Sequence, residues 1–116
     1  MPISPARAAA LEMASARPPS LARDRDGIAL GGVRTPDVDV PVATLSGDAP
    51  PGAGTICALF GSTVAFEPAD LVRRYGDRDG FLAAYRRSLD DTIARGFLLE
   101  SDRAELEERA LSVAFP

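Results

Sequence analysis

The chain contains no histidine, no lysine and no tryptophan, and it has a single cysteine, Cys57. Without histidine it offers no imidazole base for a serine or cysteine nucleophile. One thiol also falls short of the several thiolate or imidazole ligands that a zinc site needs, and it cannot form an intrachain disulfide. The apolar neighbours of Cys57 in "ICALFG" predict a buried, unreactive thiol. We therefore expect no cofactor, no metal site and no catalytic residue in this chain.

Long apolar runs and an excess of positive charge are absent as well. No stretch approaches the roughly 18 consecutive apolar residues of a membrane-spanning helix, so no membrane span is expected. The N-terminal "MPISPARAAALEMASA" is interrupted by Glu12, which argues against a signal peptide. The net charge is −4, and the arginines are interleaved with acids, so nucleic acid is not an expected partner. We expect a soluble chain whose compartment stays open, with the cytoplasm as the default.

The 116 residues suffice for one modest core. Much of the 46 % apolar fraction is alanine, and only five phenylalanines and two tyrosines give that core aromatic bulk, which predicts marginal stability. Residues 1–20 are predicted to be a flexible extension, because alanine and arginine alternate with helix-ending prolines. Residues 21–116 are predicted to form one segment, irregular over 21–66 and helical over 67–114.

The irregular part is rich in glycine and proline, which predicts turns and short extended pieces. Within it "VDVPVATL" alternates, and a strand over residues 38–45 would place one set of side chains on one face: Val38, Val40, Val42 and Thr44. Pro41 lacks an amide hydrogen, so we expect this strand at the edge of a sheet. The glycines at 27, 31 and 32 are expected to permit a tight backbone wrap before it.

Three helices are predicted in the second half. Pro68 fits the first turn of a short helix that Gly76 ends. A long helix ends at Gly96, because apolar residues recur at every fourth position: Phe81, Tyr85, Leu89 and Ile93. Ser101 is the expected cap of a third helix with a broader apolar face, made by Ala104, Leu106, Ala110, Leu111 and Val113. The short link makes the last two helices an antiparallel hairpin. The predicted fold class is α+β, mainly α, with one short edge strand.

Candidate motifs favour structural roles. The tetrapeptide "DRDG" occurs at 24–27 and 77–80, but neither copy has the third carboxylate or the glycine spacing of a calcium loop, so turn and helix-start roles are expected. Ser62 lacks the second glycine of a nucleophile elbow. The acids at 105, 107 and 108 are predicted to lie on a solvated helix face rather than to form a catalytic carboxylate pair.

Several separated blocks nevertheless occur in the order found in a known family: "ARDRDGIALGGVRTPDVDVPVATLSG", "CALFGSTVAF" and "LVRRYGDRDGFLAAYRRSLDDTIARGFLLESD". With "GGVRTP" and "FGST" as their most specific parts, they resemble the C-terminal part of a bacterial α/β-hydrolase-domain family with large, poorly characterised members. The resemblance spans about Leu21 to Ala110. It implies hydrolysis by a nucleophile, an acid and a histidine that belong to upstream sequence, since none of them maps onto this chain.

Two hypotheses for the function follow. In the first, the chain is a non-catalytic C-terminal portion of an α/β-hydrolase-domain protein, in which apolar helical and strand faces pack against a catalytic core or a partner protein, and the chain is inactive alone. In the second, it is an autonomous helix-rich interaction module. Self-association is a further expectation. Arg34 is the candidate anchoring residue, paired with Asp37, with Asp39 or with a group on the absent core, or else simply solvated.

Overall fold

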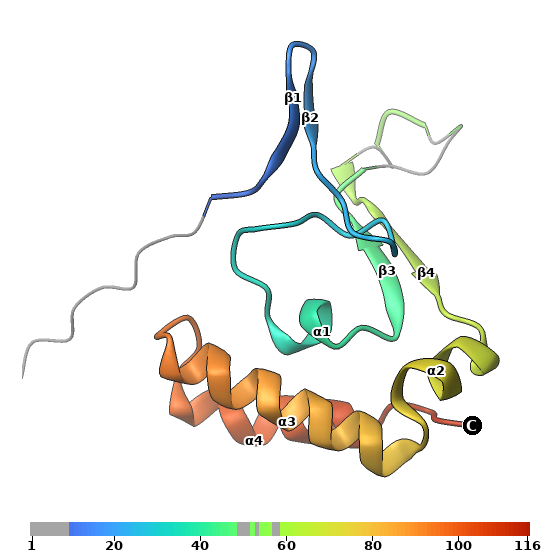
Figure 1. Cartoon of the computed structure of the whole chain (residues 1–116), viewed down its shortest axis with the longest axis vertical. Helices are drawn as coiled ribbons and strands as arrows, with labels where there is room; N and C mark the ends of the chain where they lie inside the picture. Colours follow the sequence, from blue (N-terminus) through green and yellow to red (C-terminus); the bar gives the residue numbers. More distant parts are fainter. Residues whose placement is uncertain (1–9, 49–51, 53, 57–58) are drawn as a thin grey trace, which may run out of the picture. The chain divides into compact units, whose positions relative to one another are not determined.

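The computed structural model describes residues 10–48, 52, 54–56 and 59–116 (Figure 1). In this part of the chain the fold is mixed α/β, with four α-helices and two small antiparallel sheets. The described residues belong to two compact units. We call Val33–Pro41 with Glu67–Pro116 the helical unit, and the described residues of Ala9–Gly32 and Val42–Phe66 the strand unit. Among the described residues, no helix is long and apolar enough to cross a bilayer.

The strand unit begins with a hairpin of β1 (Met13–Ala16) and β2 (Pro19–Leu21), drawn in blue in Figure 1. The chain then turns back, and the Glu12 amide donates to the carbonyl of Leu30. Gly31 makes this close return possible, because it has a φ of +76° and a Cβ there would lie 2.6 Å from the carbonyl oxygen of Ala10. The expected tight wrap at Gly31 is confirmed. The flexible extension over residues 1–20 stays a prediction, although β1 and the start of β2 lie within it.

The second sheet of this unit pairs β3 (Ala43–Ser46) with β4 (Ser62–Ala65), in a register that runs from Ala43 opposite Ala65 to Ser46 opposite Ser62. The prediction of a single short strand is therefore wrong in number. The partner of β3 is therefore β4, a strand that was not predicted. Sequence periodicity does not identify this pairing, because residues 47–61 separate the two strands along the chain and the pattern of one strand does not name its partner.

The predicted strand over residues 38–45 is wrong in its first half, where the helical unit contains α1 (Pro36–Asp39). Pro36 occupies the first helical position, where its fixed φ and missing donor suit a helix. The amides of Val38 and Asp39 both donate to the carbonyl of Thr35. The alternating valines and aspartates at the start of this segment therefore lie in and beside a single helical turn. Pro41 lies before β3 and takes no part in its strand pairing.

The three predicted helices are present: α2 (Pro68–Tyr75), α3 (Arg78–Ala94) and α4 (Arg103–Leu111). Side chains of Arg78 and Arg103 show that α3 and α4 are antiparallel. Arg78, at the start of α3, donates to the carbonyl of Leu111 at the end of α4. Arg103, at the start of α4, binds Asp90 in the second half of α3.

The core of the helical unit follows the predicted stripe of α3. Its buried apolar residues on α3 and α4 are Phe81, Leu82, Tyr85, Leu89, Leu106 and Ala110. Phe115 stacks on Phe81 with ring centroids 5.9 Å apart. The predicted apolar face of α4 is too broad, since Ala104 and Leu111 are exposed.

The predicted cap of α4 is also wrong. Ser101 lies inside η2, a 3-10 turn over Glu100–Asp102 that continues directly into α4. A cap needs a residue with extended backbone geometry immediately before the helix. Because the residue before α4, Asp102, already has helical backbone angles, no such position exists there.

Candidate functional site

The predicted anchoring residue Asp37 lies in a three-residue cluster of the helical unit. One of its carboxylate oxygens accepts a hydrogen bond of 2.9 Å from the hydroxyl of Tyr85. The other accepts one of 2.9 Å from a guanidinium nitrogen of Arg109. The three side chains come from α1, α3 and α4, so the cluster joins all three helices. We call it the Asp37 cluster.

Burial of Tyr85 determines the chemistry of this cluster. Its side chain is embedded in the core and only 2 % of the residue is exposed. Burial raises the pKa of the Tyr85 phenol well above its ordinary value of 10, and the hydrogen bond to Asp37 and the charge of that carboxylate raise it further. Tyr85 therefore remains a protonated donor at neutral pH. The cluster has the chemistry of an anchor, not of a general base.

A second tyrosine ties the same segment to the helices. The Tyr75 hydroxyl, at the end of α2, donates a 2.6 Å hydrogen bond to the backbone carbonyl of Pro41. The segment Val33–Pro41, which we call the strap, is thereby attached at Asp37 and at Pro41. Both attachments use the polar end of an aromatic side chain whose ring packs in an apolar cluster.

The other two candidate anchoring residues have different surroundings. Arg34 donates to the carbonyl of Val38 over 3.4 Å, within the strap itself. Asp39, the last residue of α1, is exposed. The structure brings Asp37 to Tyr85 and Arg109, and the pairing of Arg34 with Asp37 or Asp39 stays a prediction.

Tyr85 and Arg109 are the members of the Asp37 cluster that the sequence did not reveal. They lie 48 and 72 residues after Asp37. The sequence predicts Tyr85 on the apolar stripe of α3, which is correct for its buried ring. The available signal was its hydroxyl, because a buried tyrosine needs a hydrogen-bond partner.

The two "DRDG" copies have the expected structural roles. An Asp24 carboxylate oxygen accepts from the amides of Asp26 and Ile28, at 2.9 and 3.0 Å, and so closes a turn. The Asp77 carboxylate accepts from the amide of Gly80 at 2.7 Å and caps the start of α3. No group of three potential metal-ligating side chains occurs among the described residues. The aspartate that begins each copy therefore stabilises the local backbone.

The remaining catalytic candidates also have structural surroundings. Glu105 and Glu108 are exposed on α4, and Glu105 lies 3.8 Å from Arg109 of the same helix, which confirms the predicted solvated face for these two acids. Glu107 is instead half-buried and lies 4.0 Å from Arg86 of α3. Ser62 begins β4 opposite Ser46. Cys57 lies outside the described residues, so its predicted burial stays a prediction.

Comparison with known protein families gives a match over most of the chain. A family model described as an alpha/beta hydrolase domain matches residues 2–108. The match covers most of the chain and begins earlier than the Leu21 at which the sequence resemblance was placed. No curated protein and no solved structure matches the chain.

Proposed function

Because this chain belongs to the alpha/beta hydrolase domain family, we propose that it is a non-catalytic, C-terminal portion of a hydrolase of that family, which packs against a catalytic core in other sequence. One observation carries the proposal: these residues match the family over 2–108 and contain no histidine. Hydrolases of this fold activate their nucleophile with a histidine base. The catalytic groups must then come from outside this sequence.

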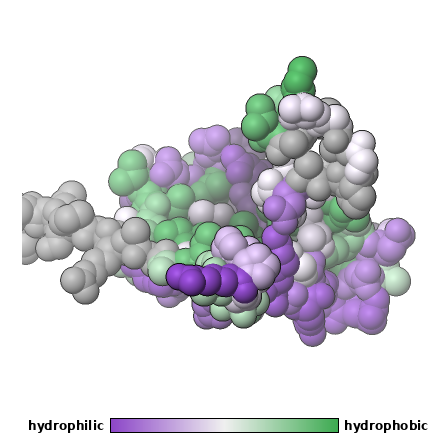
Figure 2. Space-filling model, turned by 90° about the horizontal axis from the view of Figure 1, so that it is seen from above, coloured by the Kyte–Doolittle hydropathy of each residue, from purple (hydrophilic) through white to green (hydrophobic). Residues whose placement is uncertain are grey.

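Exposed apolar side chains support a packing role. In the strand unit Phe60 is 77 % and Val64 is 63 % exposed. Figure 2 shows apolar residues, coloured green, among the polar residues of the face seen from above. Large apolar side chains exposed to this extent are available to pack against a further layer of structure.

The sheet of β3 and β4 gives a second reason. Among the described residues these two strands pair only with each other, and each has four residues. Sheets of this size are marginal by themselves and gain stability when a further layer or strand covers them. A catalytic α/β core supplies both an apolar layer and neighbouring strands.

A reconstitution experiment tests this proposal. The polypeptide encoded directly upstream is examined for a G-x-S-x-G elbow and a histidine, and is purified with and without this chain. We expect a stable complex that hydrolyses p-nitrophenyl acetate, and we expect Val64→Asp to weaken the complex at least tenfold. Val64→Thr, which keeps the shape of the side chain, serves as the matched control. An upstream polypeptide that lacks these residues, or a chain that turns over the ester by itself, would refute the proposal.

The alternative function is an autonomous interaction module. It is favoured by the internal completeness of the helical unit, whose strap and three helices have their own core and hydrogen bonds. In this case exposed apolar residues of the helices, such as Val72 and Leu111, would bind the partner. Loss of partner binding in Leu111→Asp but not in Val64→Asp would favour the alternative.

A further inference from the structure

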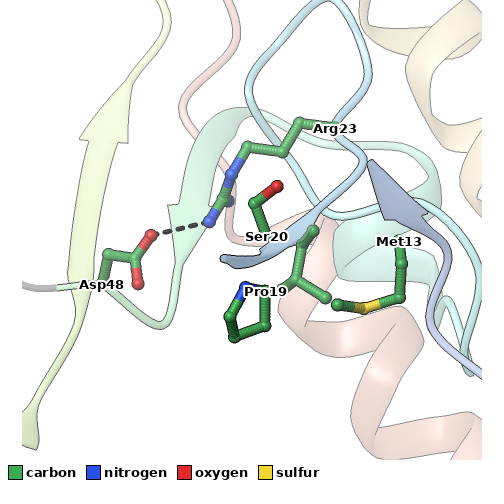
Figure 3. Close-up of a pocket in the computed structure, with 6 residues that line it drawn as sticks. Met13, Pro19, Ser20, Arg23 and Asp48 are labelled. Carbon is green, nitrogen blue, oxygen red and sulfur yellow. Dashed lines mark hydrogen bonds and ion pairs between the residues drawn. The ribbon is translucent and has the colours of Figure 1, made fainter. Parts of the chain in front are cut away.

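The strand unit contains a cavity of about 490 Å³ beside the β1–β2 hairpin (Figure 3). This volume falls in the range of about 300–1,000 Å³ that is typical of small-molecule sites. The lining residues are Met13, Pro19, Ser20, Leu21, Arg23 and Asp48. All of them belong to the strand unit, so the cavity does not depend on the helical unit or on the proposed function.

The cavity is open to solvent, with a partly exposed apolar side, on which Met13 is 52 % exposed, and a charged end. Met13 of β1 and Leu21 of β2 are cross-strand partners in the hairpin, and Pro19 is the first residue of β2. Arg23 and Asp48 form the charged end, and Figure 3 shows their side chains pointing toward one another. An apolar wall next to a fixed charge suits an amphipathic ligand.

The guanidinium of Arg23 is held in place by the backbone. One of its terminal nitrogens donates a 3.0 Å hydrogen bond to the carbonyl of Gly27. Gly27 belongs to the turn that the Asp24 carboxylate closes. The other terminal nitrogen donates to Asp48 at 2.6 Å. One edge of the guanidinium is therefore oriented by the turn, and the other edge is presented to a carboxylate.

Asp48 is an exchangeable partner for Arg23. Its side chain is 78 % exposed, whereas that of Arg23 is 32 % exposed. Exposed ion pairs contribute little to stability, because water competes for both charges. A ligand whose carboxylate binds Arg23 can also place an apolar group against the hairpin. Burial of that apolar group adds binding free energy that Asp48 does not have.

We propose that this cavity binds a small amphipathic monocarboxylate. The ligand carboxylate takes the place of Asp48 on Arg23, and its apolar chain lies along Met13, Pro19 and Leu21. A single negative charge is favoured because Arg23 is the one cation among the lining residues that the structure describes. The displaced Asp48 stays close and disfavours a second negative charge on the ligand.

Titration of the full chain with octanoate, followed by amide NMR, tests the proposal. We expect saturable shifts at Ser20, Leu21 and Arg23. Affinity should fall by up to about fourfold for each methylene removed on going to hexanoate and butyrate, because each contributes up to ~0.8 kcal/mol when buried. Octanamide, which has the same chain and no charge, should bind at least tenfold more weakly. Equal binding of octanoate and octanamide would overturn the proposal.

Substitutions at the charged end give an independent result. Arg23→Gln should weaken octanoate binding about tenfold or more, since it keeps the length of the side chain but removes the fork of charged donors. Asp48→Asn should strengthen binding several-fold, because it removes the competing carboxylate. Arg25→Gln, an exposed arginine of the same turn that does not line the cavity, is the matched control and should change nothing.

The two variants have opposite expected signs, so a general loss of structure cannot imitate the result. The amide of Ile28, which is bonded to Asp24, reports whether the turn is intact in each variant. Weaker binding in Asp48→Asn, or unchanged binding in Arg23→Gln with an intact turn, would overturn the proposal.

Discussion

The hydroxyl of Tyr85 donates a 2.9 Å hydrogen bond to the carboxylate of Asp37, which lies 48 residues earlier in the chain. This part-buried bond fixes α1 on α3, and a hydrogen bond to a charged group contributes more than one between neutral groups. Arg109 holds the second oxygen of the same carboxylate. Asp37 is therefore the point at which the strap and two helices are joined.

Tyr85→Phe should lower the free energy of unfolding by about 1.5–3 kcal/mol, because the ring is kept while the hydrogen bond to a charged group is lost. Urea denaturation measures this change. Asp37→Asn should have a similar effect, and the double variant should cost clearly less than the sum of the two single changes. Asp39→Asn, an exposed neighbour, is the control and should be nearly neutral. Strict additivity of the single effects would show that the two groups do not interact.

Stability should fall as the pH rises above about 10. The pKa of Tyr85 is raised in the folded chain, so above the ordinary value of 10 the unfolded chain loses a proton that the folded chain keeps. The free energy of unfolding then decreases by up to about 1.4 kcal/mol for each pH unit. Thermal unfolding between pH 8 and pH 11 measures the slope. Tyr85→Phe should remove most of it, and an unchanged slope in that variant would contradict the assignment.

Leu89→Asp should destabilise the helical unit by several kcal/mol, in the range of about 3–5. Leu89 is fully buried on α3, so the new carboxylate would have neither water nor a partner. The matched control is Arg87→Asp, two residues earlier on the same helix and exposed. Circular dichroism melts should separate the two variants by well over 10 °C. Coincident melts would show that the stripe of α3 is not buried in solution.

The purified chain should hydrolyse p-nitrophenyl acetate no faster than buffer does. The physical reason is the absence of histidine from the whole sequence, which leaves Ser62 without an imidazole base. Ser62→Ala should therefore leave the background rate unchanged. Turnover that disappears in Ser62→Ala would reveal a different base and would contradict this expectation.

The predicted helices α2 and α3 agree with the structure because their signals are local. Pro68 at the first position, Gly76 after the last turn and a four-residue apolar repeat from Phe81 all act through neighbours within one helical turn. The turn that Asp24 closes and the helix cap at Asp77 are local for the same reason. The absence of histidine also limited the chemistry before any fold was known.

Tertiary structure decided what depends on distant partners. Alternation of valine and aspartate does not decide whether Val38 lies in a strand or in α1. A single helical turn and a short edge strand both fit that pattern. The pairing of β3 with β4, and the hairpin of β1 and β2, depend on register between separate segments. The clearest case is Asp37, which the sequence indicates only as a candidate partner of Arg34. Its partners Tyr85 and Arg109 come within hydrogen-bond distance only when α3 and α4 pack together.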